Sequence, residues 1–220
     1  MRLLIDGKNL PIDILNYITS FQTLLDGAFF IKNPETYVRK YVLTHEDTDD
    51  YLKKFKYLEY LNFKTNQKVT DQGIQHLHLK IVYLFNNQNI TDKGLIHMPL
   101  EQLYLGCNVN ITDRLIQQLK FLRVLDVGKN KFLSDNAIKN SNIERLDCGF
   151  NISFTDEGIC NLKLVSLICA FNTNFTNMGI KNSKLKFLSC GLNSNFTNEI
   201  IHTLPLKYLY RGWNYNVWIK

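Results

Sequence analysis

The chain has 220 residues, of which 45% are hydrophobic and 21% charged, and its formal net charge is +6. This composition, with 4 Pro and 11 Gly, excludes wholesale disorder and a collagen-like fold, and the length suits one large domain or one solenoid. No apolar run approaches the roughly 20 residues of a membrane-spanning helix, and the first apolar stretch is too short for a signal peptide.

The excess positive charge is confined to the C-terminal quarter. Residues 163–220 carry seven basic side chains against one acidic residue, Glu199. The remainder of the chain is electrically balanced. Because the sequence shows neither a signal peptide nor a membrane span, we expect an intracellular protein, cytoplasmic, with the nucleus left open.

The first 57 residues predict short helices that cap a solenoid. Leu10–Ile18 has Pro11 in its first turn and an apolar face, a pattern typical of the start of a helix. A second helix is expected after Asn33-Pro34, and its apolar residues are Tyr37, Val38, Tyr41 and Val42. An acidic loop over 44–50 precedes a third short helix, whose apolar residues are Tyr51, Leu52 and Phe55. We therefore predict an α-helical N-terminal cap over residues 1–57.

From residue 58 onward one pattern recurs about every 21 residues: apolar-x-x-apolar-x-apolar-x-x-Asn. Its asparagines are Asn66, Asn87, Asn108, Asn130, Asn151, Asn172, Asn193 and Asn214. Three residues after each Asn stands another apolar residue, followed in the first seven copies by Thr or Ser and then Asp or Asn. Self-similarity at such a period indicates a repeat protein. We predict eight copies over residues 58–220, the last one incomplete.

These copies resemble leucine-rich repeats. The Thr-Asp-x-Gly-Ile runs at 70–74 and 155–159 resemble the convex half of the cysteine-containing class found in F-box/leucine-rich-repeat proteins. This chain departs from that class in having Asn where the class usually has Cys, and in its shorter repeat. The resemblance implies an α/β solenoid with a parallel concave β-sheet and short convex helices.

The pattern has a physical basis of its own. Alternate apolar residues face one side of a short strand, and Thr or Ser followed by Asp suits the N-terminus of a helix. Each copy cannot bury its apolar side alone, so stacking of neighbours supplies the core. The recurring Asn can bond backbone groups that would otherwise be buried without partners.

The start of the chain also resembles an F-box, the helical motif that docks onto the linker subunit of Cullin–RING ubiquitin ligases. The matching pattern is Leu-Pro-x-Asp-Ile-Leu-x-x-Ile over residues 10–18, and it precedes leucine-rich repeats as in that family. The resemblance implies docking through Leu10, Pro11, Ile14, Leu15 and Ile18. The family's later Val-Cys-x-x-Trp-like segment is absent, so a plain structural cap is the alternative.

Residues that could carry chemistry fit the repeat instead. Inward strand positions hold Cys148, Cys169 and Cys190, which predicts a column of reduced core thiols and no metal site. Asp126 and Asp147 are one repeat apart at an outward position, and we interpret them as solvated like charges. Without a phosphate-binding loop or a Ser-His-Asp arrangement, we expect no enzyme and no cofactor.

The outward strand positions carry many aromatic residues. The candidate partner-binding residues on the concave face are Tyr83, Tyr104, Phe150, Phe171, Phe187, Tyr208, Tyr210 and Trp213. Glycines beside the aromatic stripe, such as Gly128 and Gly149, are expected to keep the backbone open. An exposed aromatic stripe on a concave sheet favours a protein partner.

The sequence therefore predicts an intracellular protein-interaction module, with a substrate-recognition adaptor of F-box type as its leading specific role. One alternative is a scaffold protein without a ubiquitin role. Another is a nucleic-acid binder that uses the basic C-terminal quarter. Lys181 and Lys184 fall on the convex side, away from the aromatic residues, which disfavours a nucleic-acid groove.

Overall fold

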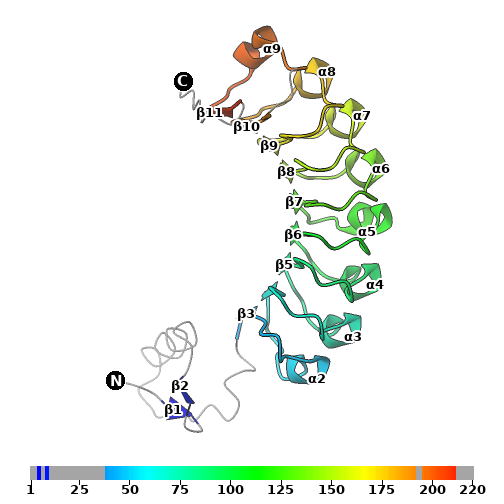
Figure 1. The fold of residues 1–220 in the computed structure, drawn as a ribbon, viewed down its shortest axis with the longest axis vertical. Coiled ribbons are helices and arrows are strands. Elements are labelled where there is room, and N and C mark those ends of the chain that lie inside the picture. The colour runs from blue at the N-terminus through cyan, green and yellow to red at the C-terminus, as the bar shows by residue number, and fades with distance from the viewer. Residues whose placement is uncertain (1–3, 6–7, 10–37, 192–194, 212–220) are drawn as a thin grey trace.

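The computed structural model describes residues 4–5, 8–9, 38–191 and 195–211. Its main feature is a nine-stranded sheet in which strands β3 to β11 follow one another in chain order. All of these neighbours pair in parallel. In Figure 1 the strands line the inner side of an arc, and the helices lie on its outer side.

Each strand of this sheet is three residues long. The strands are β3 (Lys40–Val42), β4 (Tyr60–Asn62), β5 (Ile81–Tyr83), β6 (Gln102–Tyr104), β7 (Val124–Asp126), β8 (Arg145–Asp147), β9 (Ser166–Ile168), β10 (Phe187–Ser189) and β11 (Tyr208–Tyr210). Separately, β1 (Leu4–Ile5) and β2 (Lys8–Asn9) form an antiparallel pair.

The helices are four to six residues long. They are α2 (Asp49–Leu52), α3 (Asp71–Ile74), α4 (Asp92–Leu95), α5 (Asp113–Gln118), α6 (Asp135–Ile138), α7 (Asp156–Ile159), α8 (Asn177–Ile180) and α9 (Asn198–Thr203). Thr or Ser precedes each of them, and in α3 its hydroxyl accepts a hydrogen bond from the backbone N–H of Gln72, as predicted.

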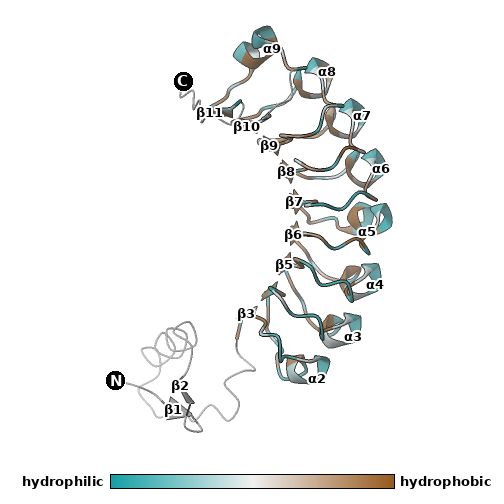
Figure 2. Cartoon of the chain, viewed as in Figure 1, coloured by the Kyte–Doolittle hydropathy of each residue, from teal (hydrophilic) through white to brown (hydrophobic). Residues whose placement is uncertain are grey.

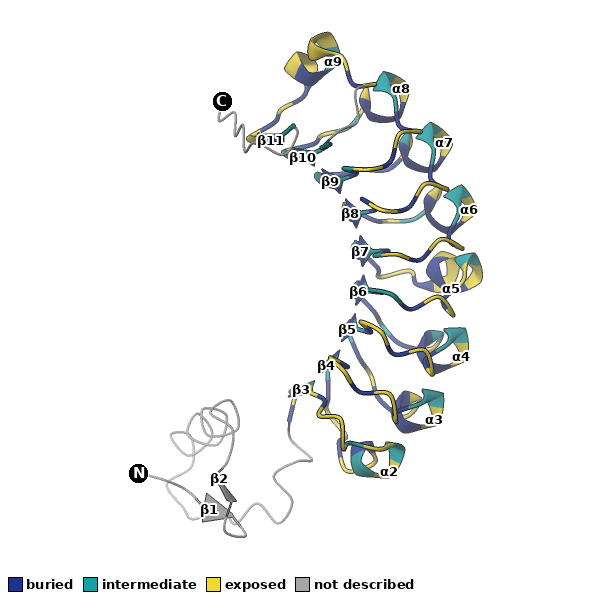
Figure 3. Cartoon of the chain, in the orientation of Figure 1, coloured by how far each residue is buried: buried dark blue, intermediate teal, exposed yellow. Residues whose placement is uncertain are grey.

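The core is one continuous layer between the strands and the helices. The middle residue of every strand from β4 to β11 is buried, whereas its two neighbours are half-buried or exposed. Figure 3 shows buried residues along the inside of the arc and exposed ones on the outer helices, and Figure 2 shows hydrophobic residues in the strands. The predicted α/β solenoid with a concave parallel sheet is confirmed.

The sheet begins earlier than the predicted start of the repeats at residue 58. Lys40–Val42 is a strand that pairs with β4, so the second predicted helix is wrong over Tyr41 and Val42, whereas its start at residues 33–37 lies outside the described residues. Val38 and Leu43 are buried, and the Tyr41 ring packs 5.0 Å from the ring of Phe55. Alternating burial in a parallel sheet explains these apolar residues better than a helical face.

Residues 38–57 therefore form a strand, turn and helix on the same plan as the repeats. The third predicted helix is present as α2, but it starts within the predicted acidic loop over 44–50. The first predicted helix, over Leu10–Ile18, lies outside the described residues.

The recurring Asn side chains hold successive turns together, as predicted. The Asn108 side chain is fully buried, and its Nδ2 donates to the carbonyl oxygens of Asn87 and Ile90, at 2.7 and 3.0 Å. Its Oδ1 accepts from the backbone N–H groups of Asn110 and Ile111. The described residues repeat this arrangement at Asn66, Asn87, Asn151 and Asn172. Each amide thus satisfies backbone groups that the stacking buries.

A second ladder joins the helical sides of the repeats. The carboxylate of Asp71 accepts from both the backbone N–H and the hydroxyl of Thr91, one repeat further on, at 2.8 and 2.6 Å. The same pair of bonds recurs from Asp49 to Asp156. The sequence had suggested only a favourable interaction of these Asp residues with the helix dipole, whereas they also bond to the following repeat.

Candidate protein-binding face

The first and third residues of each strand present their side chains on the concave face. At its N-terminal end, an aromatic group consists of Tyr60, Tyr83, Phe85 and Tyr104. The rings of Tyr83 and Tyr104 stack with centroids 4.0 Å apart, and that of Tyr60 lies 5.6 Å from Tyr83. The Tyr104 hydroxyl donates to Gln102 Oε1 at 3.0 Å. This group is therefore ordered by contacts within the sheet.

Two carboxylates occupy the middle of the face. Asp126 and Asp147 lie side by side on β7 and β8 and are half-buried, so they are only partly solvated. Each Oδ1 accepts a backbone N–H, from Gly128 at 2.7 Å and from Gly149 at 3.1 Å. Burial raises the pKa of Asp126, with a further contribution from the Asp147 charge, and burial also raises the pKa of Asp147.

A second, exposed aromatic group follows strands β8 and β9. The rings of Phe150 and Phe171 stack with centroids 4.9 Å apart and an angle of 19° between planes. Phe150 is 55% exposed and Phe171 41%. Ile152, two residues after Phe150, is exposed as well and extends the apolar surface along the chain.

A third aromatic group lies on β10 and β11. The Phe187 ring is 6.4 Å from that of Tyr208 and 5.4 Å from that of Tyr210. Seven of the eight predicted concave residues therefore lie in the described part of the chain and form three groups. Trp213, the eighth, lies outside the described residues, as do Leu10, Pro11, Ile14, Leu15 and Ile18.

Residues 75–98 match the family model described as Leucine Rich repeat. No curated protein matches the chain. The matched segment runs through α4 and β5, and the same unit recurs along the described sheet. The described residues thus form a solenoid whose repeating unit is similar to a leucine-rich repeat.

One aromatic residue of this concave face escaped the sequence analysis. Phe85 is 43% exposed, has a positive φ of 52°, and its ring lies 6.3 Å from that of Tyr83. Other repeats have Gly at this turn position, including Gly106 and Gly128. A bulky residue in the left-handed region of backbone conformation is unusual. An alignment of the repeats would have revealed Phe85 as an aromatic residue at a position that other repeats fill with Gly.

The glycines beside the aromatic residues also have a structural reason. Gly128 has a φ of +51°, and a Cβ on it would overlap the carbonyl oxygen of Gly106 in the preceding turn. Close stacking of successive turns thus requires glycine at Gly128, a structural role that the sequence analysis did not assign to it.

The three cysteines predicted in the core are buried and free of disulfides. The Cys148 thiol lies within hydrogen-bonding distance of the carbonyl oxygen of Ile168. Burial raises the pKa of Cys148, Cys169 and Cys190, which keeps their thiols protonated and unreactive at neutral pH. Their arrangement is that of core residues.

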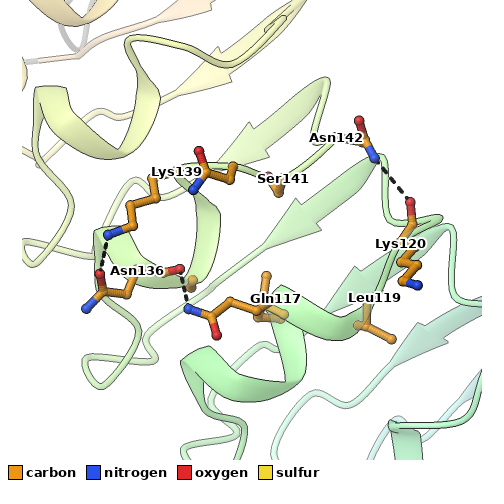
Figure 4. A pocket seen from close by; sticks show the side chains of 10 residues that line it. Gln117, Leu119, Lys120, Asn136, Lys139, Ser141 and Asn142 are labelled. Carbon is orange, nitrogen blue, oxygen red and sulfur yellow. Dashed lines mark hydrogen bonds between the residues drawn. The ribbon is translucent and has the colours of Figure 1, made fainter.

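A shallow hollow lies on the helical side, between α5 and α6 (Figure 4). Gln117 Nε2 donates to the carbonyl oxygen of Asn136, and Lys139 Nζ donates to Asn136 Oδ1. The residues that line it include amides and lysines but no carboxylate, histidine or cysteine.

Among the described residues, no cluster of three His, Cys, Asp or Glu side chains could hold a metal ion. None of their helices is long and apolar enough to cross a membrane. What distinguishes this surface is thus the exposed aromatic groups on the concave sheet.

Proposed function

We propose that this protein binds a protein partner on the C-terminal half of its concave face. The observation that carries the proposal is the stacked, exposed pair Phe150 and Phe171. Solenoids commonly use their concave surfaces for binding, and leucine-rich repeats generally serve as protein-interaction modules.

The energetics of the face support this role. Outward side chains contribute little to the stacked core, so the fold itself does not require two exposed phenylalanines here. Their mutual stacking contributes about 0.5–1.5 kcal/mol, and Phe150 and Phe171 still remain 55% and 41% exposed. Aromatic anchors in interfaces commonly cost about 2 kcal/mol or more of binding when truncated, or roughly thirtyfold in Kd.

A quantitative affinity purification tests the proposal. Three proteins would be immobilised in equal folded amounts and incubated with cell lysate: wild type, the double variant Phe150→Ala/Phe171→Ala and the control Met178→Ala. Met178 is exposed on α8, on the helical side, and matches the loss of an exposed apolar side chain. We expect proteins retained by wild type and by the control to be depleted at least tenfold from the double variant. An unchanged set of retained proteins would contradict the proposal.

The adaptor role is a separate proposal that rests on the pattern over residues 10–18. Its support is the position of that pattern ahead of leucine-rich repeats. A recombinant Cullin–RING linker subunit should co-purify with the chain and should be lost on Ile14→Asp. Absence of co-purification with the wild type would leave the N-terminal segment a cap.

A further inference from the structure

A row of charged residues runs along one edge of the sheet, directly before each strand. Its members, the edge row, are Arg39, Glu59, Lys80, Glu101, Arg123, Glu144, Val165, Lys186 and Lys207. They are neighbours in space, because the backbone N–H of each donates to the carbonyl oxygen of the preceding member. Adjacent strands are about 4.8 Å apart, so each side chain can reach the next.

The signs of these charges alternate from Arg39 to Glu144. Glu59 Oε1 lies 3.2 Å from Arg39 Nη1 and 3.3 Å from Lys80 Nζ. Arg123 Nε lies 3.9 Å from Glu144 Oε1. A basic residue in this part of the edge row therefore has a glutamate on a neighbouring strand.

The alternation ends at Val165. Lys186 follows Val165 and is followed by Lys207, so two exposed lysines lie on adjacent strands with no acidic neighbour in the row. Among the described residues neither lysine forms an ion pair. Glu199 is the one acidic residue of the basic C-terminal quarter, and it lies on α9 rather than in the edge row.

Aromatic residues directly follow the two lysines in the chain. Lys186 precedes Phe187 and Lys207 precedes Tyr208, and these rings belong to the third aromatic group of the concave face. Tyr208 is 47% exposed. The aromatic rings of β10 and β11 and an unbalanced pair of positive charges thus occupy consecutive positions at the start of these two strands.

We infer that this corner binds an acidic segment of a protein partner that also carries an aromatic anchor. The inference rests on the proposed function and specifies the chemistry of the partner. Carboxylates of the partner would continue the alternation that the chain's own glutamates maintain up to Glu144, and the anchor would pack on Phe187 and Tyr208. Charges at the rim of an interface mainly set specificity and association rate.

The arrangement favours a polypeptide over a nucleic acid. Binding to nucleic acid requires several cations that follow the phosphate backbone. Here only two lysines of the row lack an ion pair among the described residues, and Arg211, which directly follows β11, donates to Asn198 Oδ1 and to the carbonyl oxygen of Phe196 at 2.6 and 2.8 Å.

The test uses a defined probe and fluorescence anisotropy. A fluorescein-labelled copolymer of glutamate and tyrosine is titrated with the full chain, and labelled single-stranded DNA is titrated in parallel. We expect saturable binding of the copolymer that weakens as salt rises, because exposed charges are screened. Lys186→Ala/Lys207→Ala should raise its Kd about five- to tenfold. The matched control Lys181→Ala/Lys184→Ala removes the same charge from exposed positions and should change it less than twofold.

Other outcomes overturn the inference without ambiguity. Equal effects of the two lysine pairs would show that only net charge matters. Tighter binding of DNA than of the copolymer would favour a nucleic acid. Loss of copolymer binding in Phe150→Ala/Phe171→Ala but not in Lys186→Ala/Lys207→Ala would retain the proposed function and reject the acidic partner. Absence of copolymer binding also rejects it, whereas the proposed function is judged by its own purification.

Discussion

Removal of one amide from the Asn ladder should destabilise the solenoid strongly. In Asn108→Ala, the carbonyl oxygens of Asn87 and Ile90 and the N–H of Ile111 lose the hydrogen bonds at 2.7, 3.0 and 3.2 Å. All three of these residues are buried. A buried polar group left without a partner costs about 1–3 kcal/mol, so we expect a loss of at least about 3 kcal/mol.

The matched control is Asn110→Ala, two residues away. Asn110 Nδ2 donates to the carbonyl oxygen of Gln88 at 2.6 Å, but both residues are exposed and water can replace that bond. We expect its cost to stay below about 1 kcal/mol. Urea unfolding followed by circular dichroism and by tryptophan fluorescence would measure both, since two probes reveal any stepwise loss of repeats. Equal midpoints for the two variants would refute the ladder as the main link between turns.

Three further predictions concern single positions in the described chain. Gly94→Ala should cost about 1–3 kcal/mol in urea unfolding, because a Cβ would overlap Asp71 Oδ1, whereas Gly149→Ala, whose nearest atom is 3.5 Å away, should be nearly neutral. Thiol titration of the native protein should label Cys107 and Cys160 rapidly, and only denaturation should release the buried thiols of Cys148, Cys169 and Cys190. Asp126→Asn should stabilise the fold at pH 7, because burial raises the folded pKa of Asp126 and so penalises its charged form. That gain should disappear below about pH 4, where the carboxyl is protonated in both folded and unfolded states.

The inward positions were predictable because packing imposes the same demand on every repeat. A buried strand residue has to be apolar, and a buried turn needs an amide that both donates and accepts hydrogen bonds. Residues equivalent to Leu103 and Asn108 therefore recur with the period of the repeat. The cysteines follow the same rule, since a thiol can replace an aliphatic side chain in the core.

Strand β3, the first of the parallel sheet, was not predicted because its repeat departs from the pattern at two positions. Tyr41 takes the place of the central aliphatic residue, and no Asn follows Leu43 at the usual distance. The half-buried Tyr41 side chain nevertheless packs against Phe55 and the core. Pairing with β4 joins residues about 20 positions apart, and a search for local helical periodicity does not detect such pairing.

The Asp–Thr ladder and the edge row were missed for a related reason. Asp71 was interpreted within its own helix, but its carboxylate bonds to Thr91. Glu59 likewise gains its partners from the two adjacent strands. Side chains that act between repeats are recognised only when the residues at one repeat position are compared along the whole chain.

That comparison also separates the two ends of the concave face. At the N-terminal end, the Tyr83 ring contacts those of Tyr60 and Tyr104, and the Tyr104 hydroxyl donates a hydrogen bond to Gln102, so these tyrosines have partners within the sheet itself. At the C-terminal end, Phe150 is more than half exposed and the edge row loses its alternating charge. Neither feature contributes to the buried core, and both lie where the partner is proposed to bind. A partner that contacts this face should therefore centre on β8 to β11.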